Sequence, residues 1–343
     1  MVYYDRLVQL SLSLSLSLSL SLSLSHSLTH SLSPLCLGIA MGLTVSVKWT
    51  GLGFVATAGL PLALQALRHF TSFLRELKEY YENDTTTKKK NKRQPIPNLI
   101  LWGVTAGVTM IAVMTLVYLA TWVIHFSVLT QTGPGNIWHA PRFLSSLQGS
   151  DHDTGEGGGG HVPYTMWEKI VEIHQKMFDA NKNLQTGHSY GSAWYNWPMM
   201  EKSMSYWVKH IRGLGSAKVM LQGNAAVFAC TSLVTLFMIV GVVCTWTRWD
   251  DTSLADQQRQ SCLWASWLLF GYAINILPYI LVTRVCFFYH YAPSLLFAML
   301  LSGLAFDKYF PPIERAMVVG GVISCCLIFF VSNAPLHYAQ FVA

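Results

Sequence analysis

Six long apolar runs dominate the pattern of hydrophobic and polar positions along the chain. They lie at 35–67, 99–126, 219–246, 261–282, 285–305 and 314–332. A membrane-spanning helix needs about 20 mostly apolar residues, and each run approaches or exceeds that length. The first run is long enough for one tilted helix or two short ones, with Pro61 as a candidate break. The pattern predicts an all-α, polytopic membrane protein with about six to seven transmembrane helices.

A second pattern, the strict alternation of serine and leucine, fills residues 11–25 and continues with interruptions to Ser33. Alternation is typical of a half-buried strand. Here a strand would lie unpaired beside a membrane, and a helix would have no consistent apolar face. The repeat is also what a long CT dinucleotide tract would encode. We therefore interpret residues 1–35 as a low-complexity segment, disordered and without a role in any site.

Composition and charge agree with a membrane protein. Hydrophobic residues make up 52% of the 343 residues and charged residues only 12%, whereas globular chains carry about 25% charged residues. The net charge is +6, and its densest cluster is the lysine-rich run at 88–93. Because no aromatic interleaving or nucleic-acid motif accompanies this run, nucleic acid is not an expected partner. Beside a span, the run indicates a cytosolic flank.

This orientation divides the chain into four parts. After the Ser-Leu segment (1–35) come transmembrane helices over 36–126, which include a basic cytosolic loop at 69–97. A large lumenal loop (127–218) and a C-terminal four-helix transmembrane domain (219–343) follow. A tight turn at Thr283-Arg284 is then lumenal, where a cation departs from the positive-inside rule. The seven cysteines lie in apolar runs without a CxxC pair, so we expect neither a metal site nor a disulfide framework.

The lumenal loop carries one strong helix signal. Thr165 and Glu168 have the spacing of a capping box, and apolar residues follow at helical intervals. These features predict an amphipathic helix from Met166 to Leu184, after a glycine-rich linker at 155–160. Its apolar stripe is typical of packing or of contact with the membrane interface. We interpret His174, on that stripe, as a structural histidine rather than a ligand.

Two further features of the sequence point to a binding site. Residues 188–207 gather aromatic rings near a membrane entry, which favours an aromatic belt at the lipid interface or a wall that stacks on sugars. Lys48, Arg284 and His290 are ionisable residues in or beside apolar runs. Such residues usually line a cavity or bind a charged ligand, although Arg284 could also extend to a lipid headgroup. Together these cations suggest an anionic ligand, such as a lipid phosphate.

Several long motifs make the chain resemble the C-terminal part of the protein O-mannosyltransferases, which use dolichyl-phosphate mannose as donor. The matching stretches, in the family's order, are LGIAMGLTVSVKWTGL (37–52), VIHFSVLTQTGPG (123–135), FLSSLQG (143–149), EKIVEIHQKMFDANKNL (168–184), HSYGSAWYNWPMM (188–200), QGN (222–224), GYAINILPY (271–279) and RVCFFYHYAPSL (284–295).

The resemblance implies a membrane-embedded glycosyltransferase of the endoplasmic reticulum, or of a bacterial plasma membrane, that transfers mannose to Ser or Thr hydroxyls of secretory polypeptides. It implies a lipid-linked donor as substrate, no cofactor, and a homodimer or a heterodimer with a related mannosyltransferase. By motif, donor-phosphate binding would fall to Lys48, Arg284 and His290. The residues that shape the lumenal site would be His188, Tyr195, Trp197 and Asn224.

The sequence departs from the family in two places. The β-trefoil (MIR) domain usual in eukaryotic members is replaced by a short stretch after residue 149. The family's Asp-Glu pair, needed to take the acceptor proton, has no counterpart, so the catalytic residues are unknown and the chain is expected to be N-terminally incomplete. A catalytically inactive paralogue acting as a scaffold subunit is the alternative. A small transporter is a third hypothesis, which lacks inverted repeats and leaves the motifs unexplained.

Overall fold

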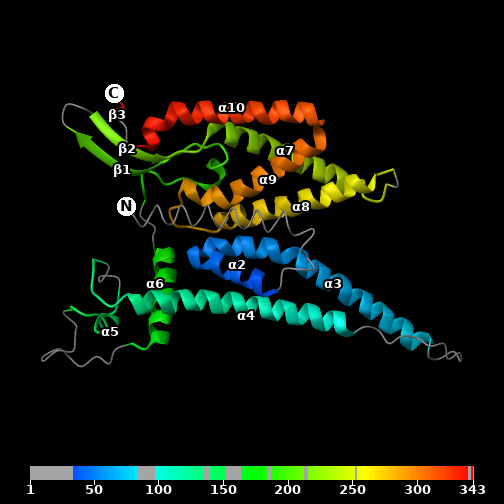
Figure 1. Ribbon diagram of the computed structural model, residues 1–343, viewed down its shortest axis with the longest axis horizontal. Helices are drawn as coiled ribbons and strands as arrows, with labels where there is room; N and C mark the ends of the chain where they lie inside the picture. The colour runs from blue at the N-terminus through cyan, green and yellow to red at the C-terminus, as the bar shows by residue number, and fades with distance from the viewer. Residues whose placement is uncertain are drawn as a thin grey trace. The chain divides into compact units, whose positions relative to one another are not determined.

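The computed structural model describes residues 34–83, 97–134, 139–150, 164–183, 187–211, 215–251, 253–338 and 341–342 (Figure 1). Most of the Ser-Leu segment, the lysine-rich run and the glycine-rich linker lie outside the described residues, so the interpretations placed on them stay predictions. The described chain is mostly helical and forms two compact units, which meet in the sequence at Ala180 and Asn181.

Five of the described helices are long and apolar enough to cross a membrane, which confirms the predicted multi-pass helical architecture. They cover Thr105–Val128, Ala225–Thr247, Asp256–Ile280, Phe288–Tyr309 and Pro312–His337. Two shorter apolar helices, Pro34–Val47 and Trp49–Leu64, account for the first apolar run. The apolar pattern therefore located the spans, and their ends differ from the predicted ends by several residues.

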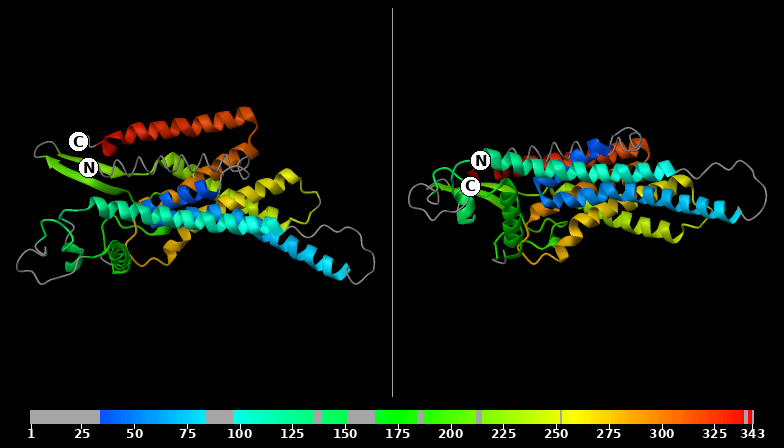
Figure 2. Two further views of the ribbon diagram at one scale, coloured as in Figure 1. Left: turned by 60° about the horizontal axis from the view of Figure 1, so that its bottom comes forward. Right: turned by 90° about the horizontal axis from the view of Figure 1, so that it is seen from below.

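The first unit begins with α2 (Pro34–Val47), which packs along α4 (Pro97–Val128) (Figures 1 and 2). Gly38 and Gly42 make this approach possible. A Cβ atom at Gly38 would lie 2.8 Å from the Met110 carbonyl oxygen, and one at Gly42 would lie 2.7 Å from Cβ of Val117. Small residues four apart let two membrane helices come close, where van der Waals contact holds them.

The first apolar run breaks at Lys48, and the prediction of a break at Pro61 is wrong. Lys48 has extended backbone angles (φ −164°, ψ 145°) and precedes the short η1 (Trp49–Gly51). The Gly51 amide donates a 2.8 Å hydrogen bond to the Lys48 carbonyl, which closes the turn. Because the helix ends before Lys48, this lysine does not lie in the middle of an apolar helix. Pro61 lies inside α3 (Leu52–Asn83), where a proline removes a single helical hydrogen bond.

Helix α3 continues to Asn83, so the first part of the predicted 69–97 loop is helical. The capping-box prediction for the next element is confirmed. The Glu168 amide donates to the Thr165 hydroxyl (3.3 Å), and the Thr165 amide donates to the Glu168 carboxylate (2.8 Å). Helix α6 (Met166–Asn183) follows, one residue short of its predicted end.

Helix α6 crosses the C-terminal end of α4 at a steep angle, and Figure 2 (left) shows it end-on while α4 runs across the view. A buried cluster joins the two helices to α5 (Pro141–Leu144) and to the residues that follow it. Its members are Phe126, Phe143, Leu144, Leu147 and Ile170. If α4 crosses the bilayer, α6 lies close to the membrane plane, as expected for an interfacial amphipathic helix.

The second unit contains four apolar helices that alternate in direction (Figure 1). They are α7 (Ala225–Thr247), α8 (Asp256–Ile276), α9 (Ala292–Tyr309) and α10 (Pro312–His337), with η4 (Leu277–Ile280) and η5 (Phe288–Tyr291) between α8 and α9. Helix α9 contacts the other three, and its residues Phe297, Ala298 and Leu301 are at most 1% exposed. It is therefore the central helix of the unit.

A small antiparallel sheet, which the sequence reasoning missed, precedes α7. Strand β1 (Met204–Ile211) pairs with β2 (Gly215–Leu221), which also pairs with β3 (Phe341–Val342). The residues of β1 include aromatic and β-branched types that favour strands. An irregularity in pairing between Ser205 and Trp207 breaks the alternation that would have marked the strand.

Candidate functional site

Residues 188–200, which follow α6 and are called the aromatic loop below, dock on the segment that joins α8 to α9. The Ser192 amide donates a 2.9 Å hydrogen bond to the Cys286 carbonyl. At Gly191 a Cβ atom would lie 2.9 Å from Cγ1 of Val285, so this approach requires glycine. Two motifs almost a hundred residues apart, HSYGSAWYNWPMM and RVCFFYHYAPSL, thus form one structure. The segment between η4 and η5 is longer than the predicted tight turn at Thr283-Arg284.

Trp197 and His290 form the buried floor of this structure, being 1% and 2% exposed. Their rings are stacked with centroids 6.0 Å apart, and Tyr279 lies edge-on to both. His290 Nδ1 bonds to the backbone of Phe287, 3.1 Å from its nitrogen and 2.9 Å from its oxygen. This burial makes both side chains part of the packed interior that supports the loop.

Arg284 and His188 are the more accessible predicted residues of this cluster. Arg284 is half-buried, and within the described side chains no carboxylate lies at ion-pair distance from it. His188 is exposed, and its ring lies 5.2 Å from that of Phe287 in an edge-on arrangement. Its Nδ1 accepts a 3.1 Å hydrogen bond from the Tyr190 amide. Because Nδ1 accepts this bond, Nε2 is the ring nitrogen that can donate to an anion.

At the opposite end of the second unit, a comparable arginine is paired. Arg248 forms a 3.1 Å ion pair with Asp251. Hydrogen bonds from Ser253, followed by those from Arg248, hold the pKa of Asp251 at about 2. Because α8 ends and α9 begins at the other end, Arg284 lies far from this pair (Figure 1). Of these two arginines, Arg284 is the one with no carboxylate at ion-pair distance within the part of the chain that the structure describes.

The other two residues predicted to shape the lumenal site, Tyr195 and Asn224, have different surroundings from each other. Tyr195 is 63% exposed and lies edge-on to Trp194, which is compatible with contact with a ligand or a membrane. Asn224 caps α7, since its side-chain oxygen accepts from the amides of Ala226 and Val227. Its Nδ2 donates a 2.9 Å hydrogen bond to the Cys326 carbonyl on α10. Asn224 therefore joins two helices.

Lys48 belongs to the first unit, where it is exposed at the helix break. A chain of hydrogen bonds begins at the next residue. Trp49 Nε1 donates to the Tyr118 hydroxyl (2.9 Å), which lies 2.7 Å from His174 Nε2, and His174 Nδ1 lies 2.6 Å from the Ile170 carbonyl oxygen. Both nitrogens of His174 are thus hydrogen-bonded, as expected for a structural histidine.

Charges around α5 and α6 hold the start of α6 in place. Arg142 forms a 3.0 Å ion pair with Glu168 and stacks 4.7 Å above the Tyr164 ring. Hydrogen bonds from the Thr165 backbone and side chain, and then the Arg142 charge, lower the pKa of Glu168 below its ordinary value. Burial lowers the pKa of His139, although the Glu172 carboxylate opposes this shift. Glu172 itself accepts a 2.8 Å hydrogen bond from the Ala140 amide.

Three residues that matter in these clusters were not singled out from the sequence. Ser192 fastens the aromatic loop, Lys202 donates a 3.0 Å hydrogen bond to the Gly191 carbonyl, and Tyr118 is the middle of the hydrogen-bond chain. Ser192 lies inside the motif HSYGSAWYNWPMM (188–200), and this motif is the sequence signal for it. Among the described residues, no group of three or more His, Cys, Asp or Glu side chains is arranged to hold a metal ion.

Comparisons with known proteins agree on one family. The model of the C-terminal four-transmembrane region of protein O-mannosyltransferases matches residues 166–341. Among curated relatives, dolichyl-phosphate-mannose–protein mannosyltransferase 1 of Candida albicans is 29% identical over 51% of this chain and 21% of its own length. The enzyme of the same name from Saccharomyces cerevisiae is 30% identical over 52% of this chain and 22% of its own length.

A mouse relative, protein O-mannosyl-transferase 1, is 29% identical over 48% of this chain and 22% of its own length. The chain thus matches about a fifth of the length of these curated relatives. Among solved structures, the S. cerevisiae protein O-mannosyltransferase Pmt1-Pmt2 complex bound to the sugar donor has a similar fold. Its TM-score is 0.68 at 17% identity, over 90% of this chain and 67% of that one. The family model matches just over half of this chain, and the chain therefore belongs to the protein O-mannosyltransferase family.

Proposed function

We propose that the chain binds the phosphate of dolichyl-phosphate mannose and takes part in the transfer of mannose to Ser and Thr hydroxyls of secretory proteins. Membership of the family supports the reaction class. The observation that carries the proposal is Arg284. It is half-buried, has no carboxylate at ion-pair distance among the described side chains, and lies two residues before Cys286, whose carbonyl accepts a hydrogen bond from Ser192 of the aromatic loop.

The chemistry of the donor matches this arrangement. A guanidinium can donate two parallel hydrogen bonds to a phosphate, and such charge-assisted bonds are stronger than neutral ones. Near a membrane the lower effective dielectric constant strengthens the attraction further. The Nε2–H of His188 is a second candidate donor on the same loop structure. Lys48, on the first unit, is a further candidate cation for a lipid phosphate.

The remaining parts of the proposal follow the relatives. The solved neighbour is a Pmt1-Pmt2 complex bound to the sugar donor, and this supports a related mannosyltransferase as the partner of our chain. A dimer of two copies is the other arrangement. The names of the curated relatives support dolichyl-phosphate mannose as the donor. We place the chain in the endoplasmic reticulum membrane, with secretory polypeptides as acceptors.

Donor binding by the full chain in lipid nanodiscs tests the proposal. Dolichyl phosphate is titrated and the bound fraction is measured by native mass spectrometry. We expect Arg284→Gln to weaken binding about tenfold or more, because charge-assisted hydrogen bonds are lost. Arg248→Gln is the matched control, since it removes the same charge from the other end of the unit. Equal affinities of Arg284→Gln and the parent chain would reject the proposal.

A second measurement separates an enzyme subunit from a scaffold. Mannose transfer to a Ser/Thr peptide is followed in microsomes that contain the chain together with a related mannosyltransferase. If Arg284→Gln lowers transfer and Arg248→Gln does not, the chain takes part in the reaction. Transfer that is unaffected by Arg284→Gln would favour the non-enzymatic scaffold.

A further inference from the structure

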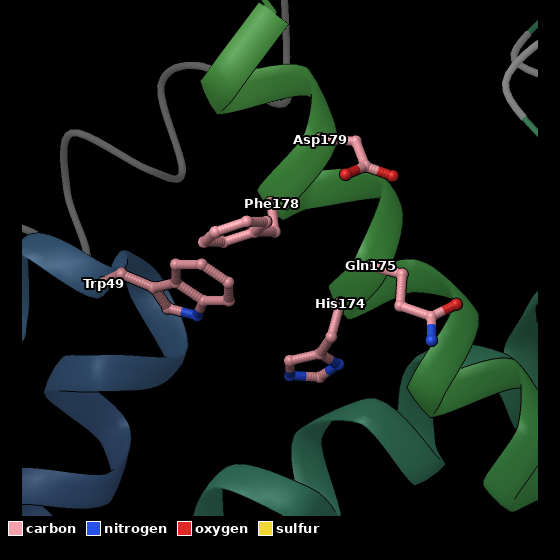
Figure 3. A pocket seen from close by; sticks show the side chains of 5 residues that line it. All are labelled: Trp49, His174, Gln175, Phe178 and Asp179. Carbon is pink, nitrogen blue, oxygen red and sulfur yellow. The ribbon is translucent and has the colours of Figure 1, made fainter.

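An open pocket lies in the first unit, between the helix break at Lys48 and helix α6. Its volume is about 580 Å³, and its lining residues are Trp49, His174, Gln175, Phe178 and Asp179 (Figure 3). The volume is within the range of about 300–1,000 Å³ that small-molecule sites occupy. All five lining residues belong to the first unit, so the pocket is complete within that unit.

Three of the lining side chains are aromatic, and hydrogen bonds fix two of their rings. The Trp49 indole donates to the Tyr118 hydroxyl. In the neutral form of His174, that hydroxyl donates to Nε2, and Nδ1 donates to the Ile170 carbonyl. Because the polar hydrogens of these two rings are already bonded, the rings offer a ligand their faces and edges only. Phe178, which is 62% exposed, adds a third ring that can meet a ligand only through its face or edge.

The charged group of the pocket is a carboxylate. Asp179 is exposed, and among the described side chains no cation lies at ion-pair distance from it, although the chain carries a net charge of +6. The face of an aromatic ring is also negative, because of its quadrupole. A carboxylate beside aromatic faces therefore attracts a cation, and a quaternary ammonium suits them best because it has no N–H group that needs an acceptor.

The position of the pocket favours a lipid headgroup as the carrier of this cation. Helix α6 crosses the C-terminal end of α4, whose residues Thr105–Val128 are long and apolar enough to span a membrane (Figure 2). An amphipathic helix across the end of a span lies in the headgroup region. Trp167, about three turns before Phe178 and thus on the same side of α6, is 63% exposed. Exposed aromatic rings are typical of helices at this interface.

We infer that this pocket binds the quaternary ammonium of a phosphocholine lipid headgroup. The three rings would surround the trimethylammonium group, and Asp179 would supply the opposite charge. Lys48, which is exposed and immediately precedes Trp49, suits the phosphate of the same headgroup, because phosphocholine carries both charges a few bonds apart. The inference goes beyond the proposed function and uses residues of the first unit alone. Dolichyl phosphate binding through Arg284 can therefore succeed or fail independently of it.

Binding of dihexanoyl phosphatidylcholine to the full chain in maltoside detergent tests the inference, with native mass spectrometry as the measurement. The comparison lipid is its carbon isostere, in which a tert-butyl group replaces the trimethylammonium, so that only the positive charge is lost. We expect the parent chain to prefer the choline lipid about tenfold. Phe178→Leu, Trp49→Leu and Asp179→Asn should each reduce this preference to about threefold or less, whereas Trp49→Phe keeps a ring face and should retain it.

The matched controls are Trp167→Leu and Asp250→Asn, which remove an exposed ring and an exposed carboxylate outside the pocket. Both should keep the preference of the parent chain. Equal affinity of the parent for the two lipids, or equal losses in Phe178→Leu and Trp167→Leu, would overturn the inference. Free choline that binds as tightly as the lipid would overturn the lipid headgroup in favour of a soluble quaternary ammonium. A lysine peptide that binds more tightly than the lipid would overturn it in favour of a polypeptide.

Discussion

The indole Nε1 of Trp197 donates a 2.9 Å hydrogen bond to the hydroxyl of Ser192, while the Ser192 amide donates to the Cys286 carbonyl. One serine thus connects the buried tryptophan of the aromatic loop to the segment that carries Arg284. Arg284 lies two residues before Cys286, so this connection holds the backbone next to the proposed phosphate-binding arginine.

Ser192→Ala should lower the free energy of unfolding by about 1–3 kcal/mol, since it leaves the buried indole N–H of Trp197 unpaired. Thermal unfolding of the purified chain in detergent measures the change. Ser189→Ala is the control, because Ser189 is exposed three residues earlier in the same loop. Equal unfolding temperatures for the two variants would show that the bond contributes nothing to stability.

The elements with local signals were predictable from the sequence. Apolar runs located the helices because a span must satisfy its backbone internally over a fixed length. Thr165 and Glu168 located the start of α6 because a capping box needs only residues three apart. The role of His174 also followed from its place on the apolar stripe of α6, and its two hydrogen bonds agree with that interpretation.

What depends on distant contacts was not predictable. Tyr118 and His174 are 56 positions apart, and no periodicity connects them. The docking of the loop at Ser192 on Cys286 is likewise a contact between remote segments. The break lies at Lys48 and not at Pro61, because an ionisable residue among apolar neighbours costs more in a membrane helix than a proline does. Strand β1 was not predicted because its pairing with β2 is irregular between Ser205 and Trp207, where the regular alternation of a strand is interrupted.

Tyr118→Phe should destabilise the first unit by about 1–3 kcal/mol, because it leaves the Trp49 indole and His174 Nε2 without their shared partner. Thermal unfolding is again the measurement, and Tyr338→Phe is the control, since Tyr338 is exposed at the end of α10. Unchanged stability would mean that the hydrogen-bond chain forms without net gain.

The start of α6 should loosen in acid because of Glu168. Hydrogen bonds from Thr165, and then the Arg142 charge, hold the pKa of this carboxyl below 4.5 in the folded chain. A group whose folded pKa is depressed stabilises the fold above its unfolded pKa, and that contribution disappears as the pH falls through the folded pKa. Hydrogen exchange of the α6 amides, corrected for intrinsic rates, should therefore accelerate below pH 4.5.

Glu168→Gln separates this titration from the capping geometry. Glutamine can complete a capping box but does not ionise, so the variant should lose the acid-dependent acceleration while α6 persists at neutral pH. Glu314→Gln, in the first turn of α10, should leave the exchange of α6 as it is in the parent chain. The same acid dependence in Glu168→Gln would assign the effect to another group.

Helices α8 and α9 pack tightly where Gly271 faces Phe297, and this contact can be tested by a double-mutant cycle. A Cβ atom at Gly271 would lie 2.5 Å from Cδ1 of the Phe297 ring, which is 1% exposed and cannot move aside. Gly271→Ala should therefore cost about 1–3 kcal/mol of stability through overpacking. Phe297→Leu alone should also destabilise, because it leaves space in the core of the unit.

In the double variant, the smaller leucine gives the new methyl group room, so the loss should be smaller than the sum of the two single losses by about 0.5–3 kcal/mol. Thermal unfolding of all four chains measures this coupling. Gly303→Ala on α9 is the control, since a Cβ atom there meets nothing within 4 Å. If the two single losses of stability add exactly in the double variant, the methyl group of Gly271→Ala does not contact the Phe297 ring, and the two helices have moved apart at Gly271. In that case, the destabilisation by Gly271→Ala would reflect a shift of α8 as a whole.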